Sequence, residues 1–522
     1  MPVSWTLSEP TVRRRLGPSG ENAAVTRPQP RLSDDDVARL RESLAQAGFT
    51  VDAVRDLLGA RASSALDRNE TTPGLAATSG GSPLETLTRL WPLQATVDRA
   101  AAEAVLPLGA LMAGGFVAVA GDSVRALVDV RPYADDAGDW WVAADLTPGL
   151  DGERTVVPEE HVLGVNAASS TLAQLTVRRP AGRALDLGTG CGVQALHLAR
   201  HCDEVVATDV NRRALALASV TARINGIDVD LREGSLFEPV ADERFDLIAT
   251  NPPFVVSPGG QHIYRDSGFA GDEVSRRVIV DGAGRLADGG TLQSLANWMH
   301  VRGEDWRERV GGWVASTGCD AWVVQREVQD PAEYVELWLR DSGDVGRDGY
   351  RERYEAWLSW FDANDVEGVG FGWVNLRASG AARPAQSLEE WPHAVEQPLG
   401  PTVAGWFDRA EALRVSDDEL WGTRLRMAAD VVQEQIGRPG DEDPEHIVLR
   451  QRRGLMRAVQ MGTAEAGLIG ACDSTLPLNA IVDALASVLE VDAPALRAEL
   501  MPRVREFVAD GFLTPAGMIT ST

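Results

Sequence analysis

The sequence contains no lysine, so arginine supplies all 50 of its basic residues, against 77 aspartates and glutamates. The formal net charge of the 522-residue chain is −27. Because nucleic acid is polyanionic, this charge excludes binding through a broad basic face. A nucleic-acid substrate would need a local arginine patch or a partner protein.

Cysteine is also scarce. The four thiols, at Cys191, Cys202, Cys319 and Cys472, include no CxxC pair and no cysteine–histidine cluster with zinc spacing. We therefore predict no metal site. We interpret the thiols as reduced, which indicates a cytoplasmic protein.

Long apolar runs are absent as well. The longest, near residues 106–120, contains two adjacent glycines and is too short to span a bilayer. The first 20 residues are polar, include three consecutive arginines and lack the apolar segment of a signal peptide. These absences argue against a membrane partner, and they leave the oligomeric state open.

The length that is present suggests about three domains, since a typical domain has roughly 150 residues. Residues 1–30 are rich in proline, serine and arginine and are expected to form a flexible tail. Beyond this tail we expect an N-terminal domain at 31–150, an α/β domain at 151–380, a connector at 381–410 and a C-terminal domain at 411–522.

The N-terminal domain is expected to be helical and to end in a β-hairpin. Ser33 followed by three aspartates has the pattern of a capped helix start. Predicted helices cover 34–44, 50–58 and 84–104, a loop covers 62–82, and strands cover 116–119, 124–130 and 139–144. Helices followed by a small hairpin favour a winged-helix-like unit.

The α/β domain alternates strands and helices from residue 181 onward. Predicted strands cover 184–187, 204–208, 229–232, 245–250 and 291–296, and predicted helices cover 193–199, 212–225 and 274–286. This alternation predicts a Rossmann-like parallel sheet with helices on both faces. Further strands are expected at 320–326 and 368–376.

The C-terminal domain shows a mixed pattern. Residues 413–436 favour a helix, 438–444 a loop, and 445–460 either β-structure or a helix. Three short helical patterns follow at 464–468, 478–488 and 493–510, before a Gly-Phe-Leu segment. This order favours a second winged-helix-like module.

A glycine-rich loop follows the first strand of the α/β domain and opens a helix. Its glycines allow a sharp turn and a close approach to a ligand, and the helix N-terminus adds N–H donors. A plain turn is the alternative interpretation. The residues that we expect to bind a cofactor here are Asp186, Gly188, Thr189, Gly190, Cys191 and Gly192.

Asp209 ends the second strand, 23 residues after Asp186, close to the offset of a ribose-binding carboxylate. Each carboxylate oxygen can accept a hydrogen bond from one of two vicinal ribose hydroxyls. Alternatively, Asp209 caps the helix that begins at Arg212, and the two roles can coexist. NAD and S-adenosylmethionine both use such a site, and the G-x-G-x-G spacing favours S-adenosylmethionine.

An Asn251-Pro252-Pro253-Phe254 motif follows the strand at 245–250, at the sheet edge where ligands bind in doubly wound folds. The two prolines fix the backbone, so the Asn251 side chain and the Pro252 carbonyl become preset acceptors. Two acceptors that hold the N–H bonds of a planar nitrogen favour a pyramidal nucleophile without a strong base. Phe254 can stack on a planar acceptor. The alternative is a structural turn with a core phenylalanine.

Together these motifs resemble the class I S-adenosylmethionine-dependent methyltransferases of the "small" type, which include release-factor glutamine, ribosomal RNA guanine-N2 and adenine-N6 methyltransferases. The resemblance spans about residues 155–300. It implies that the Asn-Pro-Pro-Phe motif binds the acceptor. It also implies further S-adenosylmethionine-binding residues, namely Asn211, Gly234, Ser235, Leu236 and Asn251. Ser235 stands where relatives often place an aspartate that meets the adenine amino group.

Two further segments are expected to complete the site. Residues 162–167 precede the first strand of the α/β domain, where relatives lay a segment over the cofactor. Tyr264 and Arg265 follow the acceptor motif and are expected to contact the substrate from a lid. A solvated loop is the alternative interpretation of that lid.

The leading hypothesis is N-methylation of an exocyclic nucleobase amine in RNA or DNA. The alternative is a protein glutamine N5-methyltransferase acting on a release-factor-like, translation-related protein. A hypothesis of another class is a non-catalytic winged-helix protein that senses S-adenosylmethionine. An NAD-dependent oxidoreductase is disfavoured because the sequence shows no hydride-transfer constellation.

Overall fold

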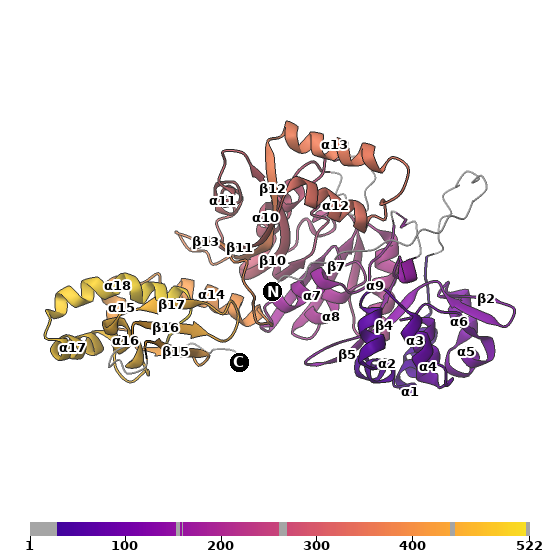
Figure 1. The fold of residues 1–522 in the computed structure, drawn as a ribbon, viewed down its shortest axis with the longest axis horizontal. Helices are drawn as coiled ribbons and strands as arrows, with labels where there is room; N and C mark the ends of the chain where they lie inside the picture. Colours follow the sequence, from indigo (N-terminus) through magenta and orange to yellow (C-terminus); the bar gives the residue numbers. More distant parts are fainter. Residues whose placement is uncertain (1–28, 153–156, 159, 260–268, 439–443, 518–522) are drawn as a thin grey trace.

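The computed structural model describes residues 29–152, 157–158, 160–259, 269–438 and 444–517 (Figure 1). All but the last two residues of the expected tail at 1–30 lie outside these ranges. None of the helices in the described ranges combines the length and the apolar character that a membrane span requires.

An eight-stranded sheet forms the centre of the molecule, in the order β13-β11-β12-β10-β9-β6-β7-β8. Five of its strands are mutually parallel: β6 (Ala181–Leu187), β7 (Cys202–Asp209), β8 (Asp230–Glu233), β9 (Phe245–Thr250) and β10 (Leu286–Val301). The helices between them are α8 (Val193–Leu198), α9 (Arg212–Ile224) and α10 (Glu273–Ala283). This arrangement confirms the predicted Rossmann-like α/β fold.

The strand order reverses at β6, which lies between β9 and β7. The chain leaves β6 towards β7 and later returns to the other side of β6 in β9. Such a reversal leaves a crevice outside the carboxyl ends of the strands. The glycine loop follows β6 and the Asn251 motif follows β9, so both reach this crevice.

The other half of the sheet is mixed. β12 (Val366–Arg377) runs antiparallel between β10 and β11 (Asp320–Gln329), and β13 (Gln386–Glu390) pairs in parallel with β11 at the edge. The accompanying helices are α11 (Trp306–Ala315), α12 (Pro331–Asp341) and α13 (Tyr350–Ala363).

The predicted connector at 381–410 is wrong in part. Residues 386–390 pair with the otherwise open edge of β11, and α14 (Gly400–Ala412) begins before the connector was expected to end. Pairing with a strand more than 60 residues away is a tertiary effect that the local sequence does not reveal.

Six helices open the described part of the N-terminal domain: α1 (Asp34–Gln46), α2 (Val51–Leu66), α3 (Thr72–Ala77), α4 (Pro83–Leu90), α5 (Arg99–Val105) and α6 (Leu108–Ala113). The predicted helix start is confirmed, because the Ser33 hydroxyl accepts the Asp36 N–H at 3.2 Å. The predicted loop at 62–82 is wrong, since α2 continues past a kink at Gly59 and α3 occupies part of the remainder.

The single helix predicted over 84–104 is also wrong. The helix ends at Leu90, because Pro92 has no backbone N–H with which to continue the helical hydrogen bonds. The chain then enters the short strand β1 (Val97–Asp98) before α5 begins. The strands predicted at 116–119 and 139–144 are confirmed as β2 (Val117–Ala120) and β5 (Gly138–Ala144). The single strand predicted over 124–130 is wrong, since this segment is divided between β3 (Ser123–Ala126) and β4 (Asp129–Asp135), which belong to different sheets.

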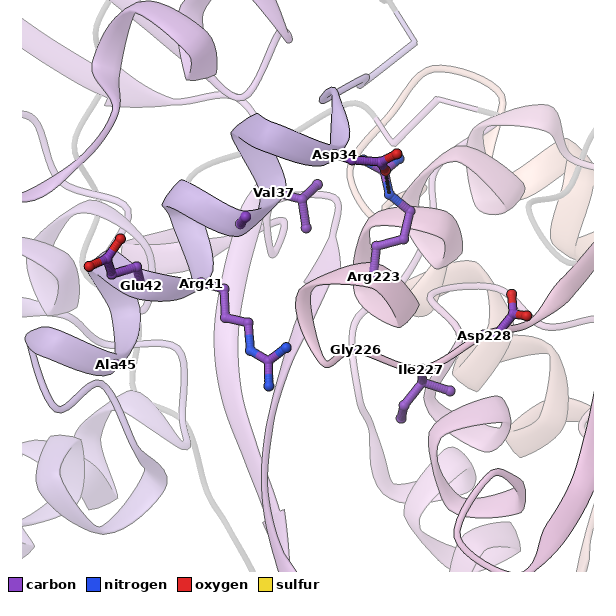
Figure 2. A pocket seen from close by; sticks show the side chains of 10 residues that line it. Asp34, Val37, Arg41, Glu42, Ala45, Arg223, Gly226, Ile227 and Asp228 are labelled. Carbon is purple, nitrogen blue, oxygen red and sulfur yellow. Dashed lines mark ion pairs between the residues drawn. The ribbon is translucent and has the colours of Figure 1, made fainter.

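The N-terminal domain shares one hydrophobic core with the α/β domain. Buried side chains such as Leu40 of α1 and Val142 of β5 form a single cluster with Leu217 of α9. Figure 2 shows α1 beside the end of α9, around a surface groove of about 600 Å³ where Arg223 pairs with Asp34 at 3.1 Å. The N-terminal domain therefore packs directly on the α/β domain.

The C-terminal elements have a core of their own and lie at the end of the molecule opposite the N-terminal helices (Figure 1). The strands are β14 (Leu425–Met427), β15 (Val431–Ile436), β16 (His446–Gln451), β17 (Ala458–Met461) and β18 (Leu513–Pro515). The helices are α15 (Asp417–Trp421), α16 (Thr463–Gly470), α17 (Leu478–Leu489) and α18 (Ala493–Ala509). The last three confirm the predicted short helices.

The helix predicted over 413–436 is wrong. The short helix α15 ends at Trp421, and residues 431–436 instead pair with β16. The apolar spacing of this segment fits both the period of a helix and the period of a strand. Pairing with the neighbouring strand decides between the two structures.

The winged-helix assignments stay predictions for both flanking domains. In the N-terminal domain, α4, β1, α5, α6 and the β2–β3 hairpin follow one another, and the strands form a sheet in the order β1-β3-β2. In the described part of the C-terminal domain, the sheet of β15, β16 and β17 precedes α16, α17 and α18, whereas a wing follows its helices.

Candidate active site

A cavity of about 410 Å³ lies at the carboxyl ends of β6, β7 and β9. Most of the expected cofactor and acceptor residues line it, namely Gly188, Thr189, Gly190, Cys191, Asp209, Asn211, Gly234, Ser235, Leu236, Asn251, Pro252, Pro253 and Phe254. Asp186 and Gly192 do not line it. Tyr264 and Arg265 lie outside the described residues.

Asp186 holds the glycine loop from behind. Its buried carboxylate accepts hydrogen bonds from the Thr189 hydroxyl at 2.6 Å and from the Ala195 N–H at 3.0 Å. Burial raises the pKa of Asp186 to about 7. The side chain therefore shapes the loop and the start of α8, and a direct cofactor contact stays a prediction.

Replacing Asp186 with asparagine is expected to weaken the pH dependence of stability. Burial raises the pKa of Asp186 from 3.8 to about 7, so between these values the folded chain keeps a proton that the unfolded chain releases. Stability from this group is therefore fully present below about pH 4 and declines as the pH rises to about 7. The urea unfolding midpoints of the parent protein and of the Asp186→Asn variant, each at pH 5 and pH 8, measure the effect. An equal decline in both chains contradicts the assignment.

Two glycines of the loop have different surroundings. Gly190 has φ 56°, and a Cβ there would meet nothing within 4 Å, so its bare backbone faces open space. Gly192 has φ 85°, and a Cβ there would lie 3.2 Å from the Ala218 Cα of α9. Gly190 thus leaves room for a ligand, whereas Gly192 lets the loop pack against α9.

Asp209 presents its two carboxylate oxygens from the end of β7. One accepts the Gly190 N–H at 2.9 Å and the other accepts the Asn211 N–H at 2.8 Å. Each oxygen retains a lone pair for a ligand hydroxyl. Burial raises the pKa of Asp209. The helix-cap alternative for Asp209 is wrong, because the N-cap of α9 is Asn211, whose side chain accepts the Arg213 N–H at 2.9 Å.

Residues 160–166 run along one side of the cavity and are held in place at two points. The Asn211 amide donates to the Glu160 carbonyl at 3.0 Å, and the buried Asp145 carboxylate accepts the Val162 N–H at 2.9 Å. Val162, Leu163, Gly164 and Asn166 line the cavity, and Asn166 also caps α7 (Ala167–Leu175). The segment therefore forms one wall of the cavity, and its place over a bound cofactor stays a prediction.

The segment after β8 forms a third wall. A Cβ on Gly234 would lie 2.4 Å from the Pro239 ring, so only glycine fits there. Leu236 holds a left-handed conformation with φ 47°. This conformation brings Ser235 and Leu236 to the cavity. A contact between Ser235 and an adenine stays a prediction.

The Asn251 motif meets the glycine loop directly. The Thr250 hydroxyl donates to the Leu187 carbonyl at 2.8 Å, which ties the two loops together. Asn251 lines the cavity, and its side chain forms no hydrogen bond within the described residues. The Pro252 carbonyl accepts the Phe254 N–H at 2.7 Å and keeps its second lone pair. Both predicted acceptors are therefore available.

A buried hydroxyl supports the motif from behind. Tyr334 of α12 accepts the Val256 N–H at 2.8 Å and the Asn297 amide at 3.1 Å. The Trp357 indole of α13 donates to the Val256 carbonyl at 3.1 Å. Burial raises the pKa of Tyr334, so the hydroxyl stays protonated. These contacts fix the backbone just beyond Phe254.

Sequence reasoning missed two aromatic residues of the site. Phe269 and Trp338 line the cavity with Phe254, and the Arg277 guanidinium lies 4.3 Å from the Phe269 ring centre. Trp338 comes from α12, far from the glycine loop in sequence. Only the packing of α12 against the acceptor motif brings it to the cavity, so no local signal identifies it.

Chemically, the cavity combines carboxylate and backbone groups on one side with two oxygen acceptors and aromatic rings on the other. Within the described residues no group of three His, Cys, Asp or Glu side chains could hold a metal ion. The doubly wound sheet, the glycine loop and the Asn-Pro-Pro-Phe motif define a class I S-adenosylmethionine-dependent methyltransferase.

Three segments of the chain match models of known protein families. A family model described as a methyltransferase small domain matches residues 163–304. Two models described only as domains of unknown function match residues 46–127 and 404–515.

Curated relatives agree with this match. A release factor glutamine methyltransferase from Geobacter sulfurreducens is 33% identical over 160 residues, which cover 28% of this chain and 54% of that protein. One from Xylella fastidiosa (strain Temecula1) is 30% identical over 199 residues, covering 37% of this chain and 70% of that protein. A ribosomal RNA small subunit methyltransferase C from Alcanivorax borkumensis is 32% identical over 116 residues, covering 22% of this chain and 32% of that protein.

The chain spans about half the length of the Geobacter protein and of a ribosomal protein uL3 glutamine methyltransferase from Bradyrhizobium diazoefficiens, to which it is 34% identical. The Xylella alignment is the more extensive, since it reaches 70% of that protein. The chain belongs to the small-type methyltransferase family that includes the release factor glutamine methyltransferases.

Proposed function

We propose that this chain transfers a methyl group from S-adenosylmethionine to a planar nitrogen, with an exocyclic nucleobase amine of RNA or DNA as the acceptor. The observation that carries the proposal is the side-by-side placement of the Asn251 motif and the glycine loop in one cavity. S-adenosylmethionine supplies an electrophilic methyl group when it is bound.

The residues present fit this cofactor. The two Asp209 oxygens suit the vicinal hydroxyls of a ribose, and the bare Gly190 backbone leaves space for a ligand. Residues of the 160–166 segment line the cavity, where they would shield a bound cofactor from water. NAD also carries such a ribose, but no hydride-transfer constellation accompanies it here.

Asn251 and Pro252 orient the acceptor nitrogen. The Asn251 amide oxygen and the Pro252 carbonyl each accept one N–H bond, which turns the nitrogen lone pair away from the planar system. Neither group needs to remove a proton before the transfer: the methylated nitrogen would be cationic and acidic and would lose one N–H proton to solvent, while the demethylated cofactor would leave as the thioether. The contribution of this motif is therefore positioning.

Aromatic rings support a planar acceptor. Phe254, Phe269 and Trp338 line the same cavity as Asn251, and ring stacking favours a flat base over a flexible chain. The net charge of −27 requires that any nucleic-acid contact be local.

Protein glutamine is the second candidate acceptor. Its side-chain amide is also a planar nitrogen, and relatives of this chain are named release factor and ribosomal protein glutamine methyltransferases. A translation-related protein would then be the partner.

We further propose that residues 83–126 form a winged helix that helps to select the acceptor. The order of α4, β1, α5, α6 and the β2–β3 hairpin supports this assignment.

All four cysteines are free and buried, which supports a reducing, cytoplasmic location.

Labelled methyl transfer tests the proposed function. The full chain with S-adenosylmethionine labelled in the methyl group is expected to label fractionated RNA or DNA, and heat-inactivated chain is the control. Label in protein alone favours the glutamine alternative. Label in none of the fractions contradicts both. Calorimetric titration should show binding of S-adenosylmethionine and none of NAD.

A further inference from the structure

A second cavity, of about 530 Å³, lies between the central sheet and the C-terminal domain. Arg179, which precedes β6, and Gln386, which begins β13, both line it. The cavity is therefore at the amino ends of the parallel strands, away from the methyltransferase cavity at their carboxyl ends. Its other walls come from α14, from the loop before β17 and from the segment after α18.

Arginine is concentrated in this cavity although the whole chain is acidic. Six arginines line it: Arg179, Arg383, Arg409, Arg414, Arg453 and Arg457. Four carboxylates also line it: Glu389, Asp408, Asp430 and Asp510. Arginines thus outnumber carboxylates here, whereas the chain has 50 basic and 77 acidic residues.

Three of the arginines already have carboxylate partners. Arg179 binds Asp408 through both terminal nitrogens. Arg457 lies 2.6 Å from both Glu389 oxygens. Arg414 lies 2.6 Å from Asp320. Within the described residues, Arg383, Arg409 and Arg453 form no ion pair.

Arg409 is the most enclosed of these three. Its Nε donates to the Ala509 carbonyl at 3.2 Å. Its guanidinium packs against Gly511, where an added Cβ would come within 3.1 Å of the guanidinium carbon. Burial lowers the pKa of Arg409 to about 10, so the side chain remains charged at neutral pH. Its two terminal nitrogens form no hydrogen bond within the described residues.

A buried hydroxyl lines the same cavity without a partner. Thr514 of β18 is 5% exposed, and its Oγ1 has no hydrogen-bond partner in the described part of the chain. Buried polar atoms are almost always paired, so an unpaired one beside a charged cavity points to a bound group. Two carboxylates oppose an anion there: Asp430, and Asp510, which lies 3.7 Å from Arg457.

We propose that this cavity binds a phosphate-bearing ligand of nucleotide size, with Arg409, Arg453 and Arg383 as its cationic partners. Guanidinium groups donate paired hydrogen bonds to phosphate oxygens. The volume of about 530 Å³ matches the size of small-molecule sites in proteins. Trp406, stacked on Trp322 with ring centres 5.8 Å apart, adds a flat wall for a base. The site stands independently of the proposed methyl transfer.

Calorimetric titration of the full chain tests this site. The probes are inorganic phosphate, adenosine 5′-monophosphate and a short single-stranded RNA. Arg409→Gln is expected to weaken the binding of a phosphate ester about tenfold or more, and Arg453→Gln about fivefold, since each removes a charge-assisted contact. Arg453 is exposed, so its variant should fold even if Arg409→Gln does not.

Arg452→Gln is the matched control. Arg452 is the exposed neighbour of Arg453 and does not line the cavity, so its replacement should leave binding unchanged. Tighter binding of the RNA than of the mononucleotide identifies a nucleic-acid ligand, and the reverse identifies a free nucleotide. Absence of binding by all three probes, or equal losses in the Arg452 and Arg453 variants, overturns the proposal. S-adenosylmethionine affinity should be unchanged in every variant, which separates this test from that of the methyl transfer.

Discussion

Replacing Asn251 with alanine is expected to slow methyl transfer by about two to three orders of magnitude, the loss seen when one preorganised hydrogen-bonding group is removed from an active site. Asn251 lines the cavity, and within the described residues its side chain has no other hydrogen bond. Its amide oxygen is therefore free to hold one N–H of the acceptor. Single-turnover rates with labelled cofactor measure the effect.

The same variant is expected to bind S-adenosylmethionine with a Kd within about twofold of the parent, because the interaction is made with the acceptor. Asn251→Asp, which keeps an oxygen acceptor, should retain more activity than Asn251→Ala. A loss of cofactor affinity equal to the loss of rate would instead assign Asn251 to the cofactor. Unchanged turnover in Asn251→Ala would end the proposed role.

Local sequence was sufficient for the five parallel strands β6 to β10 and for the loops that line the methyltransferase cavity. The strands β6, β7 and β9 are short apolar runs, and each functional loop directly follows one of them. Because parallel strands bring their carboxyl ends to one edge, the order of strands along the chain already places Gly190, Asp209 and Asn251 together. The structure adds that Asp186 supports this arrangement from outside the cavity.

The failures share a different cause, which is long-range packing. Trp338 reaches the cavity only because Tyr334, on the same helix, binds the backbone of the acceptor loop. Residues 386–390 and 431–436 become strands only because β11 and β16 offer partners. No periodicity within these segments specifies such partners, so the sequence alone leaves them open.

The joint between the N-terminal domain and the α/β domain was also beyond local reasoning, and it contains a buried ion pair. Arg213 of α9 binds Asp145, which follows β5, at 2.6 to 3.0 Å through two nitrogens. The side chains are only 4% and 0% exposed. The same carboxylate accepts the Val162 N–H, so the pair also holds the segment that lines the methyltransferase cavity.

Replacing Arg213 with methionine is expected to destabilise the fold by about 3–5 kcal/mol, because it removes the guanidinium that neutralises the buried Asp145 carboxylate. The double variant Asp145→Leu/Arg213→Met should recover much of that stability, since it removes both charges. Urea unfolding measures both effects. Arg99→Met, which removes an exposed pair with Glu103 at 2.8 Å, is the control and should leave the midpoint nearly unchanged.

The double variant separates stability from function. In the double variant the Val162 N–H loses its acceptor. If the ion pair also fixes residues 160–166, the folded double variant should therefore bind S-adenosylmethionine more weakly than the parent, even if the two proteins are equally stable. Equal stability together with equal cofactor affinity would show that this segment is held without Asp145. A cost for Arg213→Met no larger than that for Arg99→Met would show that the joint tolerates the buried charge.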